Sequence, residues 1–135
     1  MSSPIADLDC IEPEAVDKLK SIGIRTSDKL LDAAKSLRGR KMLAQRTGID
    51  EKSLLRLANK IDRMRVKGIG QDYAKLLQIA GVDTVRELKY RNPKRLAEAM
   101  AEINAKRKLV RVLPSEHTVE RWIEQAKKLP LKITY

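Results

Sequence analysis

The sequence predicts an all-α fold of two similar helical units, and three observations lead to this prediction. Apolar residues recur with a period of 3.6 rather than 2, helix start and stop signals flank the periodic stretches, and the second half repeats the pattern of the first. The chain has 135 residues, 42% hydrophobic and 35% charged. It is therefore long enough to bury a core without metals or disulfides.

Four stretches carry an apolar stripe at positions i, i+3, i+4 and i+7, as amphipathic helices do. The stripes are Leu54, Leu57, Ala58, Ile61; Tyr73, Leu76, Leu77, Ala80; Leu96, Ala99, Met100, Ile103; and Val119, Trp122, Ile123, Ala126. They predict long helices near 51–64, 93–107 and 116–128. Pairs of shorter helices are expected to form hairpins, with turns near 9–12 and 67–70.

The predicted helix ends coincide with residues that cap free backbone groups. Expected N-caps are Asp50, Asn92, Ser115 and Thr84, the last in a capping box with Glu87. Expected C-terminal stops are Gly23, Gly48 and Gly81. The β-branched run 109–113 is short and isolated, so we interpret it as an extended connector before Pro114.

The two halves of the chain match when the sequence is shifted against itself. A shift of 58 residues aligns Leu19 with Leu77, and a later shift of 65 aligns Leu54 with Val119. A seven-residue insertion around 90–110 explains the change. We therefore expect two tandem units, residues 1–65 and 66–135, that share a core.

Composition points away from several classes of protein. No apolar run approaches the roughly 20 residues of a membrane span, and the first residues do not resemble a secretory leader. A single cysteine, Cys10, and a single histidine, His117, cannot form an internal disulfide or a zinc site. We expect a cytoplasmic protein without metal or cofactor. No nucleophile with a recognisable base and no phosphate-binding lysine loop is apparent, so we do not expect an enzyme.

The charge is unevenly distributed. The chain carries a net charge of +11, but residues 1–34 hold four basic and seven acidic side chains and so carry −3, which leaves +14 for the rest. A basic excess of this size favours a polyanionic partner, nucleic acid before membrane. Solvation of helix surfaces by lysine and arginine is the alternative explanation.

The segment 66–77 carries the residues with the clearest chemistry. In it, Gly68 and Gly70 flank Ile69, and a helix is expected to start immediately afterwards at Gln71. We expect Ile69 to be buried and both glycines to adopt positive φ, which would expose backbone N–H groups. Together with the helix N-terminus these groups would form a phosphate site. Candidate cationic contacts are Lys67, Lys75, Arg63 and Arg65.

This pattern resembles the helix-hairpin-helix family, whose units bind the DNA backbone through apolar-x-x-Gly-apolar-Gly-x-x-x-Ala. The match is tight over 66–81 and places Ala74 at the small position. The duplicated layout as a whole resembles a bacterial domain-of-unknown-function family of two such SAM-like units. The residues carrying this likeness are 64–81, Asn92-Pro93 and the ending 122–130. The resemblance implies a fold and no established activity.

The first copy of the hairpin lacks both glycines. Cys10 and Glu12 stand where Gly68 and Gly70 stand in the second copy, and Asp9 and Glu14 add further negative charge. We interpret this hairpin as structural or as a protein-facing surface. In the second copy, Asp72 in the first helical turn would compete with a phosphate for the same amides.

Two functions follow as hypotheses. The first is a binding module that binds double-stranded nucleic acid, with DNA as the expected partner, through its backbone phosphates and without sequence specificity. The alternative is an adaptor or scaffold that binds a protein partner through the hairpin units.

Further basic groups at 38–41, 106–108 and Arg111 are helix-end charges or backbone contacts. Aromatic residues make up 3% of the chain, so stacking on unpaired bases is not expected from composition. We expect Trp122 to pack in the core and His117 to be exposed.

Overall fold

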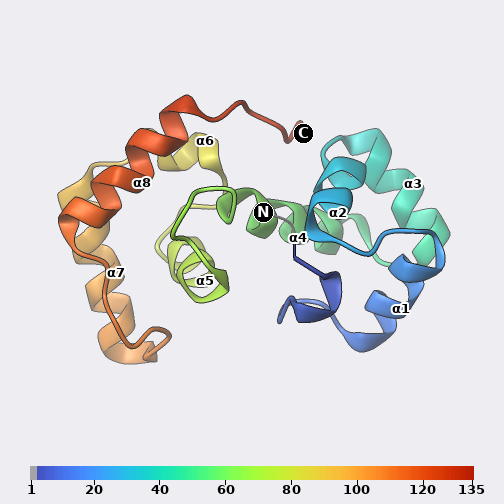
Figure 1. The fold of residues 1–135 in the computed structure, drawn as a ribbon, viewed down its shortest axis with the longest axis horizontal. Coiled ribbons are helices and arrows are strands. Elements are labelled where there is room, and N and C mark those ends of the chain that lie inside the picture. Colours follow the sequence, from blue (N-terminus) through green and yellow to red (C-terminus); the bar gives the residue numbers. More distant parts are fainter. Residues whose placement is uncertain (1–2) are drawn as a thin grey trace. The chain divides into compact units, whose positions relative to one another are not determined.

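The computed structural model describes residues 3–135 and confirms the all-α class (Figure 1). The short 3-10 helix η1, Ile5–Asp7, precedes eight α-helices within the described residues. These are α1 (Pro13–Ser21), α2 (Ser27–Ala34), α3 (Leu37–Thr47), α4 (Glu51–Arg63), α5 (Gln71–Ile79), α6 (Val85–Leu88), α7 (Pro93–Arg107) and α8 (Glu116–Lys128). The segment 109–113 forms no strand, and the β pairing of the described residues is an isolated bridge between Pro4 and Thr26.

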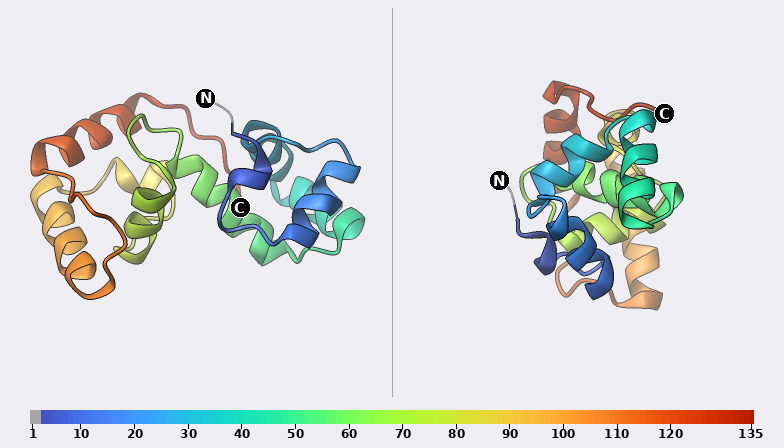
Figure 2. Two further views of the ribbon diagram at one scale, coloured as in Figure 1. Left: turned by 60° about the horizontal axis from the view of Figure 1, so that its bottom comes forward. Right: turned by 90° about the vertical axis from the view of Figure 1, so that its right-hand side faces the viewer.

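The chain divides into two compact units. The first consists of the residues up to Asp62 together with Lys132–Tyr135, and the second of Arg63–Leu131. The sequence-based boundary at 65/66 lies three residues later and assigns the last four residues to the second unit. Those residues are held in the first unit, where the Thr134 N–H donates to the Lys35 carbonyl at 2.7 Å (Figure 2).

The first unit has an apolar core of η1 and helices α1 to α4. Ile5, Leu19, Leu30 and Leu54 are fully buried in it. Arg40 on α3 is 2% exposed, and its guanidinium donates to the carbonyls of Ala34 (2.9 Å) and Thr134 (2.7 Å). This arginine fixes the end of α2 and the C-terminal segment to α3.

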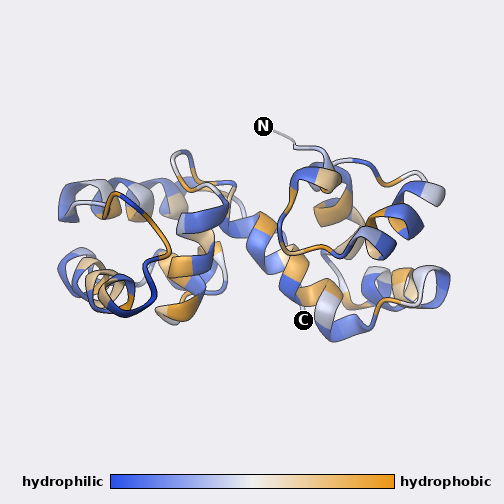
Figure 3. Ribbon diagram, turned by 90° about the horizontal axis from the view of Figure 1, so that it is seen from below, coloured by the Kyte–Doolittle hydropathy of each residue, from blue (hydrophilic) through white to orange (hydrophobic). Residues whose placement is uncertain are grey.

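The second unit has its own buried cluster, formed by residues 66–126 of the turn before α5 and of helices α5 to α8. Trp122 on α8 is 2% exposed, as expected, and its ring lies 5.4 Å from that of Tyr73 on α5, measured between centroids. Leu77 and Met100 are fully buried. Within each unit the helices carry both hydrophobic and hydrophilic residues, as amphipathic helices around a core do (Figure 3).

The predicted capping residues cap their helices. The side chains of Thr84, Asn92 and Ser115 each accept from the backbone N–H three residues later. Asp50 accepts from the Ser53 hydroxyl at 2.6 Å and the Ser53 N–H at 3.2 Å, and these bonds hold its pKa below the ordinary value. The stability that this cap contributes is present above the unfolded-state pKa and is lost as the pH falls through the folded-state value.

The duplication predicted from the shifts is visible in matching helices. Helices α1 and α5 have nine residues each and start 58 positions apart, and α4 and α8 have thirteen each and start 65 apart. Most of the insertion is the connector Lys108–Ser115, eight residues against three at Gly48–Asp50. The predicted stops at Gly23, Gly48 and Gly81 all have positive φ. Lys108 takes the same left-handed conformation after α7, with φ 51°.

Candidate nucleic-acid interface

The turn before α5 is built around Gly68. This residue has a φ of +93°, which favours glycine, and the next N–H, that of Ile69, donates to the Val66 carbonyl at 3.1 Å. Ile69 is 3% exposed and belongs to the buried cluster, as predicted. A Cβ on residue 68 would lie 3.1 Å from Nε1 of Trp122. Gly68 is therefore required by its conformation and by the close approach of α8.

We expect Gly68→Ala to lower the free energy of unfolding by about 1–2 kcal/mol, because a Cβ is strained at this φ and crowds Trp122. Chemical denaturation followed by circular dichroism would measure this. Gly70→Ala is the matched control, since a Cβ there meets nothing within 4 Å. Equal stability of the two variants would contradict this description of the turn.

Gly70 differs from the prediction that both glycines have positive φ. Its φ is −86° and its ψ −170°, so it is extended and serves as the N-cap of α5. Its carbonyl accepts the first helical bond, from the Ala74 N–H at 2.9 Å. Because glycine has no side chain, nothing caps the first turn of α5 from this position. The glycine leaves space beside the helix N-terminus.

The candidate residues beside this turn are placed as follows. Lys67, Gly68, Gly70 and Lys75 are exposed, and Gln71 is half-buried. Asp72 is exposed in the first turn of α5, where the negative charge of its carboxylate disfavours binding of an anionic ligand. The two exposed lysines flank the turn, one before it and one a helical turn after it.

The backbone of Lys67 is held by a residue that sequence reasoning missed. Its N–H donates to Oε1 of Gln125 on α8 at 3.1 Å, and its carbonyl accepts from Nε2 of Gln125 at 3.4 Å. The amide of Lys67 is therefore engaged within the protein. The Ile69 amide is likewise engaged, by the Val66 carbonyl, whereas the side chain of Lys67 is exposed.

The structure corrects the prediction for Arg63. Its side chain is 3% exposed, and the guanidinium donates through Nε to the Ala74 carbonyl (2.9 Å) and through Nη1 to the Asp83 carbonyl (2.8 Å). It therefore joins the start of the second unit to α5 and to the turn before α6. Arg65 is half-buried and donates through Nη2 to the Pro130 carbonyl at 2.6 Å. Arg63 is removed from the candidate interface, and Arg65 lies at its edge.

The equivalent turn of the first unit has the same anchoring with different chemistry. Lys60 on α4 pairs with the carboxylate of Asp9. The shifts of 58 and 65 relate Asp9 to Lys67 and Lys60 to Gln125, so both units tie this turn to their last helix. Glu12 is exposed and is the N-cap of α1, as Gly70 is of α5.

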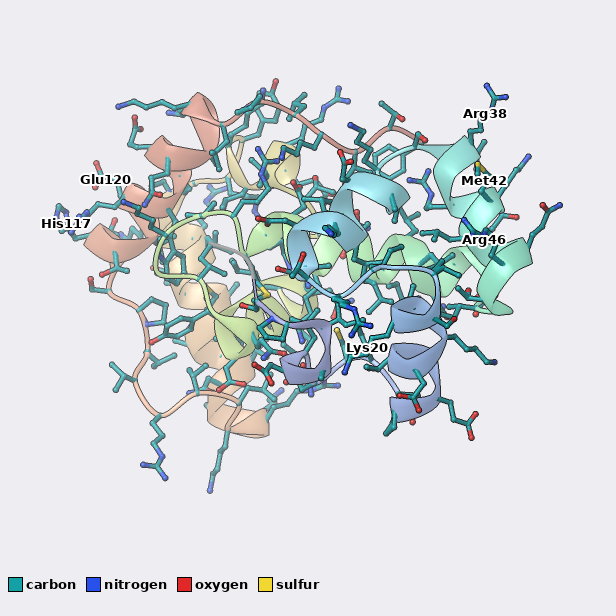
Figure 4. All side chains as sticks on the ribbon, turned by 45° about the vertical axis from the view of Figure 1, so that its right-hand side comes forward. Lys20, Arg38, Met42, Arg46, His117 and Glu120 are labelled. Atoms are coloured by element: carbon teal, nitrogen blue, oxygen red, sulfur yellow. The ribbon has the colours of Figure 1, made fainter. Side chains whose placement is uncertain are left out.

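The remaining basic groups fall into buried and exposed sets. Arg40 of the 38–41 group is a buried structural residue, whereas Arg38 and Arg46 extend outward from α3, with Met42 between them (Figure 4). The side chains of 106–108 and Arg111 are exposed. His117 is exposed at the start of α8, as predicted.

Two further findings concern other kinds of site. In the part of the chain that the structure describes, no three His, Cys, Asp or Glu side chains gather as metal ligands would. Over the same residues, no helix combines the length and the apolar character needed to cross a bilayer.

Comparison with protein families finds a match over most of the chain. A family model described as a domain of unknown function, DUF4332, matches residues 9–129. The chain belongs to the DUF4332 family. The matched region of this DUF4332 protein runs from the first hairpin turn to the end of α8 and includes helices α1 to α8. No curated protein and no solved structure matches the chain.

Proposed function

We propose that this DUF4332 protein is a non-catalytic module that binds double-stranded nucleic acid, DNA in the first instance, through its backbone phosphates. The observation that carries the proposal is the turn 67–70, where Lys67, Gly68 and Gly70 are exposed and Gly70 leaves the N-terminus of α5 without a side-chain cap. Helix N-termini of this kind are common binding sites for phosphate groups. We further propose that the two units are of the helix-hairpin-helix type, because residues 66–81 resemble that pattern, and that the protein is bacterial and cytoplasmic.

The charge of the second unit supports the same proposal. Arg63–Leu131 contains sixteen basic and eight acidic side chains, a net charge of +8, whereas the first unit contains thirteen and ten, a net charge of +3. Lys67 and Lys75 supply exposed charge beside the turn. The attraction of such a surface to phosphate falls with salt and does not depend on base sequence.

Fluorescence anisotropy with a labelled duplex at several salt concentrations tests the proposal. We expect micromolar or weaker binding, a log–log salt slope of about −2 to −4 for two to four neutralised phosphates, and equal affinity for scrambled sequences. Absence of binding at about 50 mM salt and high micromolar protein would contradict it.

The variant Lys67→Ala is expected to weaken duplex binding several-fold and to make the salt slope shallower by about 1, because one phosphate contact is lost. Glu14→Gln in α1 is a control that changes the net charge by one at the hairpin without glycines, and it is expected to leave the affinity nearly unchanged. If the Lys67→Ala protein had the same salt slope as the wild type, Lys67 would not be part of the interface.

The first unit favours an adaptor as the second candidate function. Its hairpin exposes Glu12, Glu14 and Asp17, an acidic surface that repels nucleic acid and suits a basic protein partner. Co-purification from native lysate tests this candidate. A partner retained by the wild type and lost from a Glu12→Lys, Glu14→Lys protein would support it, and identical retention by both would count against it.

A further inference from the structure

The corner between α6 and α7 presents an aromatic ring to solvent. Tyr90 is 75% exposed, more than the other large hydrophobic side chains of the described chain. Nζ of Lys89 lies 5.1 Å from the centroid of the ring, a cation–π distance. Neighbouring Leu88 is fully buried. The ring thus lies outside the core, although Leu88, two residues earlier, is part of it.

The backbone under Tyr90 is held in a defined turn. The Tyr90 N–H donates to the Glu87 carbonyl at 3.3 Å, and the Arg91 N–H donates to the Leu88 carbonyl at 3.1 Å. The guanidinium of Arg91 reaches the Ala80 carbonyl at the end of α5, at 3.4 Å. Asn92 then caps α7. A ring on this turn is presented at a fixed place.

The charge around this ring is strongly positive. Residues 86–95 contain five cations and one carboxylate, that of Glu87. The Glu87 carboxylate accepts from the Thr84 hydroxyl at 3.4 Å. Three of the cations are exposed: Arg86, Lys94 and Arg95.

We propose that Tyr90 and the surrounding cations form a second nucleic-acid site, which binds single-stranded segments by stacking an unpaired base on the ring. Aromatic faces stack with any base, and nearby cations follow the phosphate backbone. Lys89 lies against the ring and adds positive charge beside the stacked base. Bases within an intact duplex are already stacked on one another, so this site selects unpaired nucleotides. The inference rests on the proposed function only in taking nucleic acid as the partner.

Anisotropy with a labelled fifteen-nucleotide thymidine oligomer and with an abasic oligomer of the same length tests the inference on the full chain. Tyr90→Ala is expected to weaken binding of the thymidine oligomer roughly 5- to 150-fold, the range expected for loss of one stacked base, and to leave binding of the abasic oligomer unchanged. Tyr90→Phe keeps the stacking face and is expected to retain the affinity. Because Tyr90 is exposed, helix content by circular dichroism should be the same in all three proteins.

Two results would overturn the inference. One is a Tyr90→Ala protein that binds the thymidine oligomer as the wild type does, and the other is an equal loss for the thymidine and abasic oligomers. Duplex binding measured on the same proteins tests the proposed phosphate site before α5 independently of the stacking site at Tyr90. Tyr90→Ala with normal duplex binding and unchanged thymidine binding contradicts the stacking site alone, whereas a wild type that binds the oligomer but no duplex contradicts the hairpin proposal alone.

Discussion

Replacing Arg63 by methionine is expected to lower the free energy of unfolding of the second unit by about 3–5 kcal/mol. Methionine keeps an apolar stem but cannot make the two bonds to the carbonyls of Ala74 and Asp83. Hydrogen bonds from a charged donor contribute about 1.5–3 kcal/mol each, and a buried carbonyl left without its donor adds to the loss. Urea unfolding followed by circular dichroism measures the difference.

Arg65→Met is the matched control for this variant. It removes the same chemical group two residues later, where the side chain is half-buried and its bond to the Pro130 carbonyl lies near solvent. We expect a loss below about 1 kcal/mol, as for exposed polar contacts. If the two variants were equally stable, Arg63 would not hold the start of the second unit to α5 and to the turn before α6, and its assignment as a structural residue would be wrong.

The Gly70→Glu variant is expected to bind duplex DNA at least about 100-fold more weakly than the wild type while keeping its helix content. A carboxylate about 4 Å from a phosphate at a protein surface is repelled by roughly 4 kcal/mol, and each 1.4 kcal/mol is a factor of ten. The fold has room for the side chain, since a Cβ on residue 70 meets nothing within 4 Å and the φ of −86° suits any residue. Glu12 already occupies the equivalent N-cap of α1.

Gly70→Gln separates charge from size in this experiment. Glutamine fills the same space without negative charge, so we expect it to bind far better than the glutamate variant. If glutamine and glutamate weakened binding equally, blockage of the turn rather than its electrostatics would be responsible. A folded Gly70→Glu protein that binds as the wild type does would instead place the contact on diffuse basic charge such as that of Arg38 and Arg46.

The helices could be predicted from the sequence because their signals are local. The apolar stripe ending at Ile61 and the cap at Asp50 lie within the helix they define, and α4 ends at Arg63, one residue before the predicted 64. The glycine at position 81 was predictable for the same reason, since it directly follows its helical stretch. Gly70 was predicted incorrectly because the pattern of two glycines does not distinguish a left-handed residue from an extended N-cap.

The candidate site was less predictable because it depends on contacts between residues far apart in the chain. An arginine near a helix end normally interacts with solvent and the helix dipole, and only tertiary packing shows that Arg63 and Arg40 are buried against carbonyls. The anchoring of Lys67 by Gln125 spans 58 residues. The duplication could have indicated this contact. The shifts of 58 and 65 relate Lys67 and Gln125 to Asp9 and Lys60, which pair in the first unit. The amino-acid composition does not indicate that Tyr90 is exposed.

Nuclear magnetic resonance of the ¹⁵N-labelled full chain, titrated with a short duplex, tests most directly whether the turn before α5 binds backbone phosphates. The six glycines report on separate places: residues 68 and 70 in the turn, 81 after α5, and 23, 39 and 48 in the first unit. We predict that the amide signals of Gly68 and Gly70 shift most and that the three glycines of the first unit stay nearly unchanged. Equal small shifts at all six, or shifts confined to the first unit, would contradict the account.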